Sequence, residues 1–334
     1  MKAGLLYNGR EMSKVSIIIP IFKVRNFIER CVCSLFEQTL TDVEYIFVDD
    51  ASPDDSIAIL KACLERYPER KEQVTILRHE ENKGLTAARN TGLAYATGEY
   101  IAHCDSDDYV DRSMYQKLYD KASETNADLV FCDFYFKYKG DKVEIYNSVP
   151  LSDKENLVKA YIASGWTVVW NMIAKRELYD RYALHSPTNL TYCEDFHLSV
   201  RLMHFSNIIS KVELPLYYYN QENNSSIMHS LNQKHALDER VAYNEIIDFF
   251  KGERKFDEYQ KELGWRVLKN KQDLVLSGAS HEEFMNIHPW SHKYILSCPE
   301  SFCNRKILIM MWLLTHHCRF ILLPILWLRK FMNR

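Results

Sequence analysis

The chain has 334 residues and a formal net charge of −3 at pH 7, so it can hold one large or two modest domains with a substantial core. The small net charge and the lack of a basic stripe in the first 300 residues exclude a general affinity for nucleic acid. The nine cysteines form no Cys-x-x-Cys pair and no Cys/His cluster at zinc spacing. Together with the lack of a secretory signal before the first predicted strand, this indicates a reducing, cytoplasmic compartment.

The first 135 residues alternate short apolar runs with helical patterns. Residues 1–13 are predicted to be an N-terminal extension, because a second methionine, Met12, stands just before the first apolar run. β-branched and apolar runs predict strands at 15–20, 45–48, 74–77, from Tyr100 and at 129–134. Helices are predicted from Asn26, from Ser52-Pro53 as N-cap and first helical residue, and over 85–96. This alternation is typical of a doubly wound, mostly parallel sheet.

The ends of the first, second and fourth predicted strands carry the residues most suited to chemistry. They are followed by Phe22, by Asp49-Asp50, and by the run from Asp105 to Asp108. Open α/β sheets bind ligands beyond the carboxyl ends of their strands, and carboxylates two residues apart can share Mg²⁺ or Mn²⁺. The alternative is a solvated acidic turn, which an isolated Asp-x-Asp usually is. Because the run follows an apolar strand and has matching segments on both sides, we favour a site for a metal and a nucleoside diphosphate.

Two common phosphate-binding motifs are missing from the sequence. The turn after the first strand has no Gly-x-Gly-x-x-Gly, so a dinucleotide cofactor is not expected. A Gly-x-x-x-x-Gly-Lys sequence is missing as well, which argues against a P-loop.

The second half changes character. A capping box at 152–155 predicts a helix to about residue 163, and a further helix is predicted near 175–182. Glu194-Asp195 begins an amphipathic helix that runs to Phe205, and 214–219 reads as a strand. From 221 to 300 the pattern predicts a polar, helical extension. Trp166 and Trp170 fit either an acceptor cleft or core packing.

Residues 301–334 form a basic, apolar tail. This segment has six Lys or Arg and no acidic residue, which leaves the first 300 residues with 36 basic and 45 acidic groups. Its two apolar runs, 307–314 and 320–328, are too short to span a bilayer singly. Trp312, Trp327 and the positive charges favour an interfacial anchor on an anionic membrane. A helix pair folded onto the catalytic domain is the alternative.

Five segments together resemble the family 2 glycosyltransferases with a GT-A fold, over about residues 14–220. They are, in chain order, 15–22, 48–54, 82–92, 105–108 and 194–195. The resemblance implies a doubly wound mixed sheet, with a nucleotide-binding half at 14–135 and an acceptor half at 136–220. A helical C-terminal extension would follow.

The resemblance also implies which residues bind the donor. Phe22 would pack on the uracil of a UDP-sugar, and Asp50 would read the base. Asn82 and Arg89 would flank the nucleotide, and Ser106 would lie beside it. Phe22 as a core residue and Arg89 as a surface helix residue are the corresponding alternatives.

For the metal and the chemistry, the resemblance implies a second set of residues. Asp105 would face the ribose or the metal, and Asp107 would ligate Mn²⁺ or Mg²⁺ directly. Asp195 matches the general base of inverting members, with Glu194 beside it as support. Ser226 and His229 lie where some relatives contact the metal or the diphosphate, although a solvated loop also fits them.

The sequence therefore predicts a metal-dependent, inverting glycosyltransferase at the inner face of the cell membrane. It would transfer a sugar from a UDP-sugar to a glycan or lipid-linked acceptor in surface polysaccharide synthesis. A sugar-nucleotide pyrophosphorylase is one rival, although Phe22-Lys23-Val24-Arg25 is not the glycine-rich loop it would need. A catalytically degenerate scaffold relative is the other.

Overall fold

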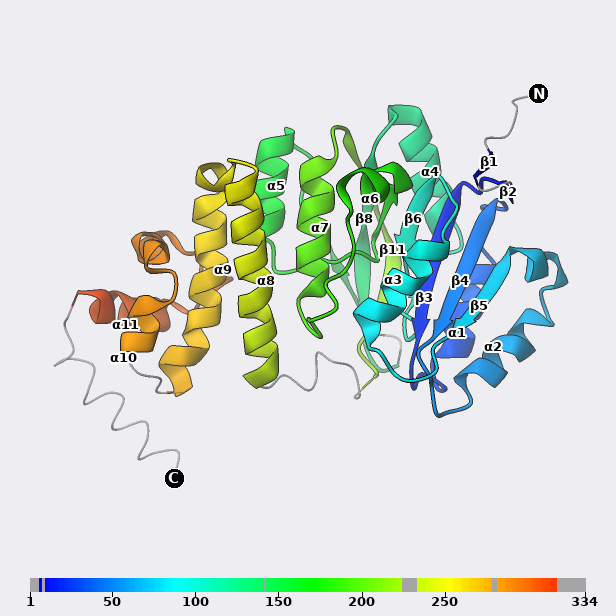
Figure 1. The fold of residues 1–334 in the computed structure, drawn as a ribbon, viewed down its shortest axis with the longest axis horizontal. Coiled ribbons are helices and arrows are strands. Elements are labelled where there is room, and N and C mark those ends of the chain that lie inside the picture. Colours follow the sequence, from blue (N-terminus) through cyan, green and yellow to red (C-terminus); the bar gives the residue numbers. More distant parts are fainter. Residues whose placement is uncertain (1–5, 8–9, 141, 224–232, 278–280, 317–334) are drawn as a thin grey trace. The chain divides into compact units, whose positions relative to one another are not determined.

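A computed structural model describes residues 6–7, 10–140, 142–223, 233–277 and 281–316 (Figure 1). The chain divides into two compact units. The first comprises the described residues of Met1–Val158 and Thr167–Ser230, and the second those of Lys159–Trp166 and Leu231–Arg334. The predicted tail run at 320–328, and Ser226 and His229, lie outside the described residues.

The first unit is built on a nine-stranded sheet, with a separate two-stranded ribbon near the N-terminus. The ribbon pairs β1 (Leu6–Tyr7) with β2 (Arg10–Glu11). The strands of the large sheet are β3 (Val15–Ile21), β4 (Val43–Asp49), β5 (Val74–Arg78), β6 (Tyr100–His103), β7 (Tyr109–Val110), β8 (Leu129–Lys137), β9 (Val143–Tyr146), β10 (Met172–Lys175) and β11 (Ile209–Asn220).

The order of the strands places three carboxyl ends side by side. The order is β5-β4-β3-β6-β10-β8-β11-β7, with β9 paired to β8. Strands β5, β4, β3 and β6 are mutually parallel, whereas β10 is antiparallel to both of its neighbours. The sheet is therefore mixed, and the expected fold class is confirmed. The ends of β4, β3 and β6 lie together, as predicted (Figure 1).

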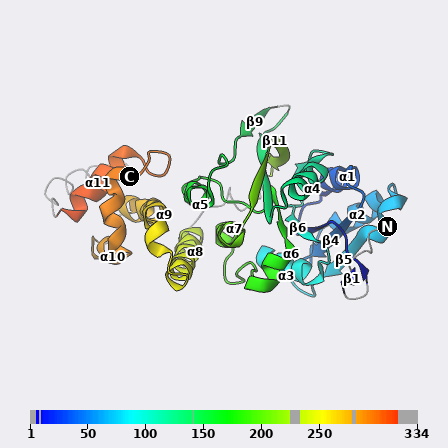
Figure 2. The same cartoon turned by 90° about the horizontal axis from the view of Figure 1, so that it is seen from above.

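Helices cover both faces of this sheet (Figure 2). One face carries α1 (Ile28–Phe36), α2 (Ser56–Leu64) and α4 (Met114–Thr125); the other carries α3 (Leu85–Tyr95), α6 (Arg176–Tyr182) and α7 (Glu194–Phe205). The central strands are the most buried, and β3 is buried at every residue. This two-sided burial explains why its sequence is a continuous apolar run and not an alternating one.

Glycine sets how closely α3 approaches the sheet. A Cβ added at Gly92 would lie 2.4 Å from Cγ2 of Ile18 in β3, so any larger residue would push the helix outward. Gly84, with φ +90, lies in the left-handed region just before the helix begins, where glycine is strongly favoured. Gly92 thus lets α3, which carries Arg89, lie close against β3, and Gly84 permits the turn before the helix.

The second unit is helical. Its helices are α8 (Gln233–Gly252), α9 (Phe256–Ser277), α10 (His281–Asn286), the 3-10 helix η3 (Pro289–Ser297) and α11 (Arg305–Thr315), and α5 (Lys154–Ile162) begins in the first unit and ends in this one. A further 3-10 helix, η1 (Pro68–Gln73), belongs to the first unit. The core of the second unit includes Leu268, Phe284, Ile295 and Met311. No helix in the described part of the chain is long and apolar enough to cross a membrane.

Two local expectations were wrong. Helix α2 begins at Ser56 after Asp55, and not at Pro53, because Asp54 accepts hydrogen bonds from the hydroxyls of Ser52 and Ser56 and fixes a turn there. The sequence analysis also missed β10. This strand has four residues and lies between β6 and β8, so its burial comes from tertiary packing and gives no periodic signal.

Candidate active site

The predicted base-reading residue, Asp50, organises the loop that begins α3. One of its carboxylate oxygens accepts the Lys83 N–H and the other the Gly84 N–H, both at 2.8 Å. His79 Nδ1 lies 2.6 Å from the first oxygen, while its Nε2 lies 2.9 Å from the Thr91 hydroxyl. Asp50 is buried, so these contacts fix its carboxylate at the end of β4.

Phe22 and Asn82, the two other residues predicted to bind the nucleotide near Asp50, are exposed. Phe22 follows β3 and has 38% of its surface exposed, with the Lys23 amine 5.0 Å from the centre of its ring. Asn82 is exposed and donates to the Asp50 carbonyl at 3.3 Å. An exposed aromatic ring beside fixed polar groups is an arrangement on which a nucleobase can stack. The roles predicted for Phe22, Asp50 and Asn82 remain predictions.

Arg89 links Asp105, which follows β6, to the acids in the first turn of α7. Its side chain is 1% exposed, and its guanidinium contacts three carboxyl groups. One Nη lies 2.8 Å from Asp105, and the other lies 2.5 Å from Asp195 and 3.1 Å from Glu194. Arg89 is thus no surface helix residue. Its predicted contact with the donor remains a prediction, and its position between the acids is a feature that the sequence analysis missed.

This cluster is unusual in holding three carboxylates around one buried cation. Burial and the neighbouring negative charge of Asp195 raise the pKa of Glu194 to about 8, so Glu194 is largely protonated at pH 7. Burial also raises the pKa of Asp195, against the lowering effect of Arg89. Both acids stand in the first turn of α7, where the helix dipole favours negative charge. Burial outweighs this dipole, so Asp195 is a more basic carboxylate than usual, and Arg89 fixes it in place.

The aspartates of the acidic turn after β6 have different surroundings. Asp108 is buried and accepts hydrogen bonds from the Tyr217 hydroxyl and the Asn220 N–H, both at 2.7 Å. Asp107 accepts from the Asn223 amide at 2.7 Å. Desolvation and the charge of Asp105 raise the pKa of Asp107 to about 6. Asp108 therefore attaches the turn to β11, while Asp107 experiences an excess of negative charge.

This donor set fits a hard divalent cation. Asp105 and Asp107 offer carboxylate oxygens, which Mn²⁺ and Mg²⁺ prefer, and a cation would relieve the repulsion that raises the pKa of Asp107. Within the described part of the chain, these two residues and a third side chain do not form a group whose ligand atoms all lie within 4.8 Å of one another. Such a site would need oxygens from a substrate, and a diphosphate supplies them.

Sequence reasoning missed several supporting residues of this site. The His79 ring forms a hydrogen bond with the Asp50 carboxylate. The side-chain amide of Asn223 donates to Asp107, and the Tyr217 hydroxyl donates to Asp108. Ser106, predicted beside the donor, is 5% exposed in the acidic turn. Trp170 is 2% exposed and stacks on Tyr217 at 4.2 Å between ring centroids, so it packs in the core.

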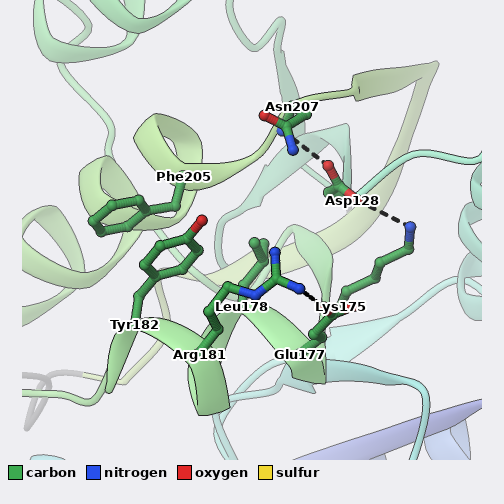
Figure 3. Close-up of a pocket in the computed structure, with 8 residues that line it drawn as sticks. All are labelled: Asp128, Lys175, Glu177, Leu178, Arg181, Tyr182, Phe205 and Asn207. Atoms are coloured by element: carbon green, nitrogen blue, oxygen red, sulfur yellow. Dashed lines mark hydrogen bonds and ion pairs between the residues drawn. The ribbon is translucent and has the colours of Figure 1, made fainter.

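A separate depression in the first unit lies at the other end of the sheet (Figure 3). It is lined in part by Asp128, Lys175 and Tyr182, close to the start of β8 and the end of β10. Asp128 accepts from Lys175 and from the Asn207 N–H at 2.9 and 2.8 Å. These contacts join the end of β10 to the segment just before β11, so the Asp128 carboxylate and the Lys175 amine have a structural role. The depression contains none of the predicted site residues.

Comparisons with known proteins found a matching family model and similar chains. Residues 16–193 match the family model described as glycosyl transferase family 2. The chain is 30% identical over 274 residues to the uncharacterized glycosyltransferase EpsJ of Bacillus subtilis, which covers 79% of this chain and 78% of EpsJ.

Two solved structures show the same fold at low identity. S. aureus TarS 1–349 in complex with UDP-GlcNAc superposes with a TM-score of 0.65 at 20% identity, covering 91% of this chain and 87% of that one. A mannosyltransferase from Pyrobaculum calidifontis, in complex with GDP-Man and Mn²⁺, gives a TM-score of 0.53 at 16% identity and covers 90% and 86%.

Proposed function

The chain belongs to glycosyl transferase family 2, and on that premise we propose that it transfers a sugar from a UDP-sugar to a hydroxyl group with inversion at the anomeric carbon. The acceptor would be a glycan or lipid-linked saccharide in surface polysaccharide synthesis. The observation that carries this proposal is the meeting of Asp105, Asp195 and Arg89 at the edge of the sheet where Phe22 and Asp50 also lie.

Asp195 is the proposed general base. Its carboxylate accepts the proton of the acceptor hydroxyl as that oxygen attacks the anomeric carbon, and the bond to the UDP oxygen breaks on the opposite face. The attacking oxygen replaces the diphosphate oxygen in one displacement, so no nucleophile from the protein is needed. Its raised pKa supports this role, because a more basic carboxylate takes up a proton more readily.

Arg89 is proposed as a positioning residue for this base. With ion pairs to both Asp105 and Asp195, it fixes the distance between the diphosphate side of the site and the base. Glu194, largely protonated at pH 7 because its pKa is about 8, leaves the Arg89 charge to the other two acids. A lysine could not span the same three carboxylates, because it presents one compact ammonium where arginine presents a planar fork.

Asp105 and Asp107 are proposed to hold Mn²⁺ or Mg²⁺. A divalent cation at this position would neutralise the diphosphate and make UDP a better leaving group. The mannosyltransferase structure with Mn²⁺ supports a metal in this fold. Asn223, which donates to Asp107 at 2.7 Å, would orient the carboxylate.

For the donor, Phe22 would stack on the base and Asp50 would accept from its N–H group, while Asn82 and Ser106 line the nucleotide. The TarS complex with UDP-GlcNAc, which has the higher TM-score of the two solved structures described above, supports uridine over guanosine.

Membrane association is proposed to place the enzyme on the cytoplasmic face, close to a lipid-linked acceptor. Within α11, Leu308 and Met311 are buried in the helical core, whereas Arg305, Lys306 and Ile309 are exposed. Positions three and four apart share a helix face, so an apolar residue and two basic ones lie together on that surface. Such a surface suits anionic headgroups.

The testing experiment is a panel of UDP- and GDP-sugars with Mn²⁺, Mg²⁺ or EDTA. Nucleotide release measures turnover, and protection against thermal unfolding measures donor binding. We expect release of UDP in the presence of metal, and its loss in Asp107→Asn together with the loss of metal-dependent protection by UDP. The matched control, Asp120→Asn on the exposed face of α4, should behave as wild type.

Different results would point to the rival functions. Pyrophosphate instead of UDP as product would indicate a sugar-nucleotide pyrophosphorylase. A scaffold would show no turnover with any donor and no protection by nucleotides. Full turnover by Asp107→Asn in EDTA would overturn the metal assignment.

A further inference from the structure

A second group of ligand-type side chains lies between α1 and α2. Glu29 and Cys33 stand four residues apart on one face of α1, and Cys63 lies in the last turn of α2. Their ligand atoms all lie within 4.8 Å of one another. Cys31 of the same helix contacts the Asp105 carbonyl instead. Cys31 and Cys33 therefore face different neighbours, and only Cys33 belongs to this group.

A positive group already lies at the centre of this cluster. Nη2 of Arg66 is 2.9 Å from the Glu29 carboxylate, 3.2 Å from the Cys33 sulfur and 3.1 Å from the Cys63 sulfur. One nitrogen thus contacts all three ligand atoms, in the place that a metal ion would take among them. The Arg66 side chain is about half exposed, at 52%, so it can turn into solvent when another cation enters.

The ligand types select the class of ion. Two sulfur ligands and one carboxylate suit Zn²⁺, which binds Cys, His and Asp or Glu, and they do not suit Mg²⁺ or Mn²⁺, which prefer oxygen. Cys63 is 2% exposed and Cys33 is half-buried, while Glu29 reaches solvent. This gradient leaves one side of the cluster open for entry and for a water as fourth ligand.

We propose that Glu29, Cys33 and Cys63 form a structural Zn²⁺ site in which the ion replaces the Arg66 guanidinium. This site is distinct from the proposed metal at Asp105 and Asp107.

The site would join two helices that flank the donor-binding edge. Helix α1 follows Phe22, and the loop between them is attached to the start of α2 and the residues before it through hydrogen bonds from the Lys23 N–H to Ser52 and from the Val24 N–H to Ser56. Zinc would add a second attachment, between α1 and the last turn of α2. It would stabilise the first unit without taking part in sugar transfer.

Co²⁺ serves as the probe, added to the full chain after EDTA treatment and in the presence of a phosphine reductant. A thiolate bound to Co²⁺ produces a charge-transfer band that carboxylate ligands alone do not, so the Asp107 site does not contribute to it. We expect one equivalent of Co²⁺ with this band, displaced by Zn²⁺, and a rise in the thermal midpoint with Zn²⁺. Cys33→Ser and Cys63→Ser should each weaken the band, and the double variant Cys33→Ser/Cys63→Ser should lose it.

Two fold-preserving variants keep the inference testable if a cysteine variant unfolds. Glu29→Gln should weaken Co²⁺ binding by at least ~10-fold, and Arg66→Ala should strengthen it, because the competing guanidinium is removed. Both side chains are more than half exposed. Glu65→Gln and Cys298→Ala, which lie outside the cluster, are the controls and should leave binding unchanged.

The proposal is overturned by three results. The first is the lack of a saturable, one-equivalent band in the reduced wild-type protein. The second is a band that persists in the double variant Cys33→Ser/Cys63→Ser, since the thiolates would then come from elsewhere. The third is weaker binding by Arg66→Ala, which would show that the arginine supports the cluster and does not compete with a metal.

Discussion

Replacing Arg89 with methionine should destabilise the catalytic unit in a pH-dependent way. The guanidinium is 1% exposed and faces Asp105, Glu194 and Asp195 at 2.5–3.1 Å. Removing one partner of a buried ion pair typically costs about 3–5 kcal/mol, because the remaining charge is left without compensation. Asp105 and Asp195 keep some exposure, at 24% and 18%, and Glu194 is largely protonated at pH 7, so we expect the lower value, about 3 kcal/mol.

The pH dependence follows from proton uptake by Glu194 and Asp195, whose pKa values are raised by burial in the folded state. Without Arg89, which lowers both, these pKa values rise further above their unfolded values, so the folded protein binds more protons and loses stability as pH rises. The difference between wild type and Arg89→Met should therefore be small near pH 5 and near its full size at pH 8. A loss of ~3 kcal/mol corresponds to a fall of roughly 6–12 °C in the thermal midpoint for a unit of this size.

The assay is urea and thermal unfolding at pH 5 and pH 8, with Arg70→Met as the matched control. Arg70 is also buried but donates to the carbonyls of Phe36 and Gln38, which do not titrate, so its loss should be similar at both pH values. An Arg89→Met loss as large at pH 5 as at pH 8 would refute the charge-cluster reasoning and leave packing as the role of this side chain.

Four further predictions test the remaining assignments. Asp195→Asn should lower turnover by ~10²–10⁴-fold while UDP still protects against unfolding; loss of UDP protection with turnover unchanged would contradict the role of base. Phe22→Ala should weaken UDP binding by about 1–3 kcal/mol in a titration, whereas Tyr95→Ala, another exposed aromatic, should not. Burial lowers the pKa of Lys271 in the folded protein to about 7. Between pH 7 and about 10.5 the unfolded chain therefore binds more protons than the folded one, so the free energy of unfolding of the helical unit should rise with pH in that window. In calorimetry, the Lys271→Met variant should lack this slope and be more stable at pH 7, and an unchanged slope would exclude a perturbed lysine. The double variant Arg305→Glu/Lys306→Glu, which changes only exposed residues of α11, should bind anionic vesicles more weakly while donor hydrolysis continues, and unchanged vesicle binding would end the anchor hypothesis.

Several features of the site could be predicted from the sequence because they depend on local patterns. Strands β3, β4 and β6 are apolar runs that end in polar residues, and parallel strands align their carboxyl ends. The placement of Phe22, Asp50 and the acidic turn at one edge followed from these facts. The start of α2 could not be predicted in the same way, because Ser52-Pro53 resembles a helix start whereas the hydrogen bonds of Asp54 decide where the helix begins.

Taken alone, the sequence determined the fold class and which acids follow the strands at the sheet edge where we propose the active site, because hydrophobic periodicity and strand ends are local properties. The tertiary structure decided which distant groups meet. Arg89 and Asp195 are 106 residues apart yet lie at 2.5 Å, and Cys33 and Cys63 show no metal spacing in sequence because their sulfurs come from two helices. Contacts of this kind depend on how elements pack, and the packing of α3 against β3 through Gly92 leaves no repeating pattern along the chain.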